Sequence, residues 1–165
     1  MFKRLSIAAT IIGATAVAFA AFAPAASAAT PPPAPEAVIA GRGLLTAQGT
    51  GVVAVKGRMD YHATADEGVL LVKDIGGDAH VDVDGHGGTG EWNGFKVYFG
   101  FQGSAHIVGS DVAVIVIGRN IDLQVFGRGW AFLKGHGTYR VNGGEPRPWT
   151  DDGAFAGLAP APLAP

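Results

Sequence analysis

The segment from His80 to Glu91, HVDVDGHGGTGE, holds the densest group of side chains in the sequence that could do chemistry. Its imidazoles and carboxylates belong to His80, Asp82, Asp84, His86 and Glu91. Alternate residues of a β-strand share one face, so the first three of these side chains would point the same way. Imidazoles and carboxylates gathered on one face suit a divalent transition ion such as zinc. The segment is therefore a candidate metal site.

The spacing of this segment also resembles the twelve-residue calcium loop of EF-hands. Asp82, Asp84 and Glu91 fall on ligand positions of that loop, and Gly85 falls on its turn glycine. His80 stands where the first carboxylate belongs, however, and calcium prefers oxygen to imidazole nitrogen. The flanking residues also have the pattern of strands rather than of helices. Calcium and zinc thus remain alternatives to a simpler interpretation, in which the polar residues face water at a glycine turn and bind no ion.

Catalysis is not expected from the remaining residues. The chain has no cysteine, which excludes thiol nucleophiles, thiolate metal sites and disulfides. Ser104 lacks the Gly-x-Ser-x-Gly surroundings of a nucleophile elbow. His62, His106 and His136 occur singly along the chain. We therefore expect a protein that is not an enzyme.

Exposed aromatic residues on a β-sheet offer a second kind of binding site, because flat π surfaces stack on sugar rings. Trp92 and Trp149 stand beside expected loops and are the candidates for such a carbohydrate site. Packing in the core is the alternative for both side chains.

The ends of the chain have the composition of targeting and spacer segments. Residues 1–28 combine a basic start, an uncharged Ala-rich run and the small residues Ala26-Ser27-Ala28, which is typical of a secretory signal peptide cleaved after Ala28. An uncleaved signal anchor is the alternative. Residues 29–37 are expected to be a Pro-rich linker, residues 38–148 the folded domain and residues 149–165 a disordered Ala/Pro tail. The sequence therefore predicts a secreted, extracytoplasmic protein.

Charge is low overall but unevenly distributed. The formal net charge is −2, too close to neutral to favour nucleic acid or an anionic membrane surface as a partner. Residues 60–91, however, hold eight acidic side chains against one lysine. We expect an envelope or extracellular partner, with no nucleic acid and no membrane contact once the signal is removed.

Short apolar alternations interrupted by glycine run through residues 38–148, the pattern of an all-β domain. We expect about ten short, mostly antiparallel strands in a sandwich or a barrel, with a β-solenoid as the alternative. Residues 112–117 are apolar at every position and predict a central strand that is covered on both faces.

An internal repeat relates residues 41–57 to residues 127–143. Seven of the 17 aligned positions are identical, and five of these are glycine. Both copies predict a strand, a Gly-x-Gly corner and a second strand, and could be neighbouring strand pairs that close the fold. Convergent turn composition in a glycine-rich chain is the alternative.

These glycine-punctuated strand pairs behind a signal peptide resemble a loose class of exported prokaryotic β proteins with no assigned activity. The resemblance implies an exported β domain and supplies no site residues. The expected function is a non-catalytic structural or binding module of the cell envelope or secreted medium. A divalent-cation module using residues 80–91 and a carbohydrate-binding module are the alternatives.

Overall fold

The computed structural model describes residues 42–159, and every regular element in that range is a β-strand. The all-β prediction is therefore confirmed. The expected signal peptide (1–28) and Pro-rich linker (29–37) lie outside the described residues. Within 42–159 there is no helix that could span a membrane.

Eight strands form one open antiparallel sheet. Two of them, β1 and β6, are very long and form most of the pairs. The strands are β1 (Gly43–Ala65), β2 (Glu67–Asp74), β3 (His80–Val83), β4 (Gly88–Trp92), β5 (Phe95–Phe99), β6 (Gly103–Val141), β7 (Arg147–Trp149) and β8 (Ala154–Leu158).

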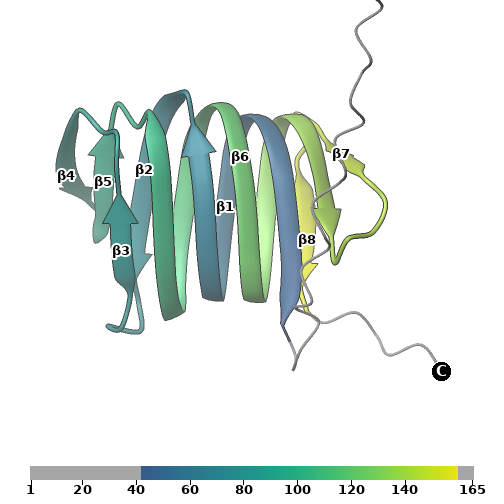
Figure 1. The fold of residues 1–165 in the computed structure, drawn as a ribbon, viewed down its shortest axis with the longest axis horizontal. Coiled ribbons are helices and arrows are strands. Elements are labelled where there is room, and N and C mark those ends of the chain that lie inside the picture. Colours follow the sequence, from purple (N-terminus) through teal and green to yellow (C-terminus); the bar gives the residue numbers. More distant parts are fainter. Residues whose placement is uncertain (1–41, 160–165) are drawn as a thin grey trace, which may run out of the picture. The chain divides into compact units, whose positions relative to one another are not determined.

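β1 and β6 wind together as one antiparallel pair. Leu123 of β6 pairs with Ala47 on one side and with Ala63 on the other, so successive turns of β1 lie on both edges of β6. In Figure 1 the two ribbons coil together, with one layer at the front, the other at the back and the bends at the top and bottom of the view. The sheet is thus bent back on itself into two layers that face each other.

The two layers are defined by the register. The β4 layer contains, in order, β4, β5, β2, residues 112–118 of β6, 51–57 of β1, 129–135 of β6, and β8. The β3 layer contains β3, residues 103–109 of β6, 59–65 of β1, 121–127 of β6, 43–49 of β1, 137–141 of β6, and β7.

Paired glycines make the bends between these layers. Gly57 (φ 144°) lies opposite Gly129, and Gly51 (φ 145°) lies opposite Gly135. A methyl group on Gly57 would overlap the carbonyl oxygen of Arg128 and lie 2.8 Å from Gly129 Cα. The chain can turn here because neither glycine carries a side chain.

These bends correct the expected architecture. The count of about ten short strands assumes that each strand ends at a glycine. The backbone pairing instead continues through the bends, and the structure has eight strands of very unequal length. The sheet is open, and a sandwich or barrel of about ten strands is not confirmed. The pairs are all antiparallel, so the sheet also differs from a β-solenoid of stacked parallel strands.

The two copies of the sequence repeat are direct partners in the sheet. Gly49 pairs with Gly137, Thr50 with His136 and Gly51 with Gly135, so the copies run antiparallel about the Thr50–His136 pair. The prediction that they are neighbours is confirmed. They do not close the sheet, whose ends remain open.

The core lies between the layers and consists of alternate residues of each strand. In residues 42–159 no charged side chain is buried. Val112, Val114 and Val116 point into the core, but Ile115 is half-buried and Ile117 is 45% exposed. The prediction that residues 112–117 are covered on both faces is therefore wrong for the outward face.

The expected disordered tail at 149–165 is also corrected. β7 pairs with residues 137–139, and β8 pairs with residues 129–133. Ala156 and Leu158 join the core, since the segment AFAGL alternates small or apolar side chains inward. The folded domain thus extends beyond residue 148 to Leu158 at least, while residues 160–165 lie outside the described range.

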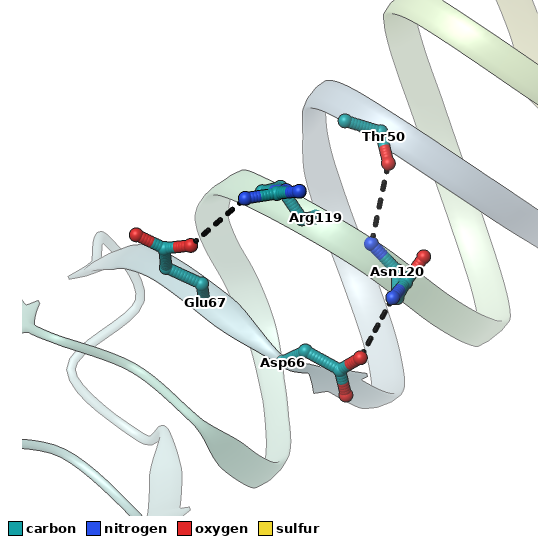
Figure 2. A network of polar contacts seen from close by, with 5 residues as sticks. All are labelled: Thr50, Asp66, Glu67, Arg119 and Asn120. Carbon is teal, nitrogen blue, oxygen red and sulfur yellow. Dashed lines mark hydrogen bonds and ion pairs between the residues drawn. The ribbon is translucent and has the colours of Figure 1, made fainter.

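Side-chain hydrogen bonds and an ion pair link one bend of β6 to Thr50 of β1 and to Asp66 and Glu67 at the junction of β1 and β2 (Figure 2). Asn120, with φ 50°, donates its backbone N–H to Thr50 Oγ1 at 3.3 Å and its side-chain amide to Asp66 Oδ2 at 2.7 Å. Arg119 donates to Glu67 Oε2 at 3.3 Å. At this bend Arg119 and Asn120 of β6 lie opposite one residue of β1, Thr50, which makes a β-bulge. The side-chain contacts of Arg119 and Asn120 therefore stabilise this bulge.

Replacement of Gly57 by alanine should lower the free energy of unfolding by at least about 2 kcal/mol, because the methyl group overlaps the opposite strand at a positive φ. Gly77→Ala is the matched control, since its φ is also positive (75°) but its methyl group would meet no atom within 4 Å. Urea unfolding of both variants measures the difference. Equal losses would show that the close pairing of glycines at the bend is unimportant.

Tyr61→Phe should leave stability unchanged or raise it by up to about 1 kcal/mol. The Tyr61 hydroxyl is fully buried without a hydrogen-bond partner, and burial raises the pKa of this phenol. Its removal relieves an uncompensated polar group in the core. A loss of more than about 1 kcal/mol in the same unfolding assay would contradict this account.

Candidate metal centre

The β3 layer brings two histidines side by side on its outward face. His62 of β1 is the direct antiparallel partner of His106 of β6. Opposite residues in such a ladder have Cβ atoms about 5 Å apart, so their side chains meet. Asp60 is two residues before His62 and therefore shares its face.

The three side chains converge on one point. Asp60 Oδ1 lies 3.1 Å from His62 Nε2 and 2.9 Å from His106 Nε2. The imidazole rings stack with centroids 4.0 Å apart and planes inclined by 12°. Each of the three side chains is about half exposed, between 43% and 54%. The group is thus preassembled by the sheet and open to solvent.

Two imidazoles and one carboxylate form a ligand set for a divalent transition ion, with further positions left to water. Ligand atoms around a zinc ion with bonds of about 2.0–2.1 Å lie roughly 3.3 Å apart, close to the observed separations. The stacked rings must each turn about χ2 before both Nε2 lone pairs meet at one ion. This torsion is soft, and the side chains are exposed enough to turn.

Sequence reasoning missed this group because His62 and His106 are far apart in the chain. One signal was available: Asp60 and His62 alternate within a strand pattern, which places a carboxylate and an imidazole on one face. His106 could not be added without the register of β1 against β6.

The structure brings part of the 80–91 segment to the same face. β3 places Asp82 directly opposite His106, and His80 directly opposite Val108, which is itself the partner of Asp60. Asp84 follows β3. The predicted ligands on β3, His80 and Asp82, are thus neighbours of the Asp60–His62–His106 group.

The other two predicted ligands lie elsewhere. The ring of His86 packs edge-on against Tyr98, with centroids 5.2 Å apart, and Glu91 of β4 pairs with Lys96 of β5. Within residues 42–159, Asp60, His62 and His106 are the only His, Asp or Glu group of three whose ligand atoms all lie within 4.8 Å of one another. The five residues predicted from the sequence do not form such a group.

β3 is held beside the site by its preceding loop. Asp78 Oδ1 accepts hydrogen bonds from the backbone N–H of Ser110 at 3.0 Å and from Ser110 Oγ at 2.9 Å, and these bonds lower the pKa of Asp78. A hollow of about 400 Å³ is lined by Asp78 of this loop, by Asp60 and His80, and by two arginines, Arg42 and Arg58. The Asp60–His62–His106 group therefore lies at the edge of an open hollow.

The two tryptophans proposed for sugar binding have opposite environments. Trp92 is 60% exposed at the end of β4. Trp149 is only 1% exposed and lies over Gly49 and Gly137, where methyl groups would come within 2.6 Å of its ring. The assignment of Trp149 to a carbohydrate site is therefore wrong, because the paired glycines make room for its indole in the core.

Comparison with known proteins adds no relative: no family model, curated protein or solved structure matches this chain.

Proposed function

We propose that this protein is an exported, non-catalytic binding module whose Asp60–His62–His106 group holds one divalent transition-metal ion. The observation that carries the proposal is the convergence of Asp60 Oδ1 with both Nε2 atoms at 2.9 and 3.1 Å. Export rests on the signal-like composition of residues 1–28.

Zinc and copper fit this group better than calcium does. Two of the three ligand atoms are imidazole nitrogens, which suit borderline ions and do not suit a hard cation that requires six or more oxygens. The neighbouring carboxylate of Asp82, on the strand beside His106, adds negative charge that favours any divalent cation there. Calcium through an EF-hand-like loop is the weaker proposal, because His80 and Asp82 lie on β3, His86 lies in the loop after it and Glu91 lies on β4, whose partner is β5.

A binding role is favoured over catalysis by the position of the group. Its ligands lie half exposed on the outward face of a sheet, beside a shallow hollow. Metal-dependent enzymes typically hold the ion in a dry, shaped cavity. Among residues 42–159, the hollow beside Asp60 is open to solvent instead.

Titration of the purified chain with Zn²⁺ should show one bound equivalent and a rise in melting temperature. Binding at 100 times the dissociation constant stabilises the folded state by about 2.7 kcal/mol. His106→Ala should weaken binding at least tenfold, since it removes one of three ligands. Acidification should also weaken it, because protons compete with the ion for imidazole nitrogen.

Two variants act as controls for this titration. His136→Ala should bind as the parent does, although His136 Nε2 also lies near a carboxylate, 3.7 Å from Asp151. His86→Ala tests the alternative site. Binding that survives His106→Ala but is lost in His86→Ala would assign the ion to residues 80–91 and overturn the proposal.

A further inference from the structure

The outward face of the β4 layer is apolar across its whole width. One continuous row of paired residues crosses it, from β8 to β5: Phe155, Phe132, Ala54, Ile115, Leu71 and Val97. Leu71 and Val97 are buried but do not belong to the core cluster, which is on the other side of the sheet. We call this row and the outward rows on either side of it the apolar face.

Large hydrophobic side chains are concentrated on this face. Five of the seven that are exposed in the described part of the chain lie here, and Ile75 and Val108 lie elsewhere. The five are Trp92, Phe99, Ile117, Trp130 and Phe155, which is 77% exposed. Phe132 and Phe155 also contact each other, with centroids 4.8 Å apart.

The charged side chains on the apolar face are lysines. Lys56 and Lys73 alternate with buried Val55 and Val72, and Lys134 follows buried Leu133, so all three point outward. Carboxylates of the β4 layer lie at its margins: Glu67 is paired with Arg119 at one bend, Asp74 caps the turn after β2 at the other, and Glu91 lies on the edge strand β4.

The outward face of the β3 layer is polar. Asp60 and Asp122 point outward from its central strands, since Tyr61 and Leu123 beside them are buried, and Asp82 lies on the edge strand β3. Arg42 and Arg58 line the hollow beside Asp60, so this side of the molecule carries charges of both signs. The molecule therefore has one polar face and one apolar face whose charged side chains are lysines.

A second copy of the chain is a poor occupant for the apolar face. Seven strand segments and three rows cover about 34 Å by 20 Å, a footprint on the order of 700 Å². This is slightly less than the roughly 800 Å² that each partner of a standard protein interface buries. A symmetric dimer would also bring the lysines of both copies into one apolar interface, where unpaired charges are costly.

We propose that the apolar face binds peripherally to anionic phospholipid bilayers. Aromatic side chains such as those of Trp92 and Trp130 favour the boundary between headgroups and acyl chains. Lysines among them can extend their ammonium groups to lipid phosphates while their methylene stems stay on the apolar surface. Bound in this way, the molecule would direct the Asp60–His62–His106 group away from the membrane.

The test is flotation of the purified chain with vesicles of phosphatidylcholine alone, or of phosphatidylcholine and phosphatidylglycerol at about three to one. We expect flotation with the anionic vesicles only, and its loss at high salt. Brominated lipids should quench tryptophan fluorescence, because Trp92 and Trp130 are exposed on this face whereas Trp149 is buried.

Variants separate the apolar face from any other lipid contact, including the apolar N-terminal segment. Phe155→Ser with Ile117→Ser, and Lys56→Gln with Lys134→Gln, should each reduce vesicle binding at least tenfold. Val108→Ser is the matched control, because Val108 is also exposed (40%) but lies on the β3 layer. This variant should bind vesicles as the parent protein does. Circular dichroism establishes that every variant is folded.

Absence of flotation with anionic vesicles would overturn the proposal, as would flotation and quenching that the double variants leave unchanged. A dimer seen in sedimentation would also overturn it, if the double variants dissociate that dimer and the dimer does not bind vesicles. Each of these outcomes is independent of Zn²⁺ binding by the β3 layer.

Discussion

Close approach of backbones at the glycine bends is the constraint on which the structure depends. In one line across the sheet, Gly68 lies opposite Gly118, Gly118 opposite Gly51, and Gly51 opposite Gly135. Two bonded strands can turn together through a tight bend only where neither has a side chain on the inside. Because the glycines are aligned across four segments, these segments turn together at one place, and two layers form without β1 or β6 ending.

The bends also decide what each outer surface displays. Ala54 and Asp60 both point outward from β1, but the turn at Gly57 places them in different layers. A single alternating strand therefore contributes an apolar residue to one outer face and a metal ligand to the other. On β6 an extra residue at each of two bends, near Ser110 and Asn120, restores the alternation so that Val114 and Leu123 both point into the core.

Local patterns predicted the fold class, and long-range register accounts for what they did not predict. Alternation and glycine content indicated an all-β chain, and neighbouring copies were one of two interpretations of the internal repeat. A positive φ at glycine is compatible both with a turn that ends a strand and with a bend that continues it, so strand number was not predictable. The same ambiguity hid the site: His62 and Asp60 share a face by local alternation, whereas His106 joins them only through pairing with His62 across 43 intervening residues. Composition misled at the C-terminus, where the Ala/Pro content of the tail outweighed the short alternation in AFAGL that forms β8.

The arrangement makes the two outer faces chemically independent of each other. A side chain of the β3 layer that faces solvent is separated from the β4 layer by the complete core, in which described residues carry no charge. Outward substitutions on either layer change neither the glycine bends nor the inward side chains, since alternation keeps the two sets apart. The same coil can therefore carry a polar face with a group suited to a cation and a lysine-bearing apolar face suited to a lipid surface, and neither requires the other to form. Because β1 and β6 contribute to both faces, only their outward residues need differ, and the shared inward residues hold each face rigid.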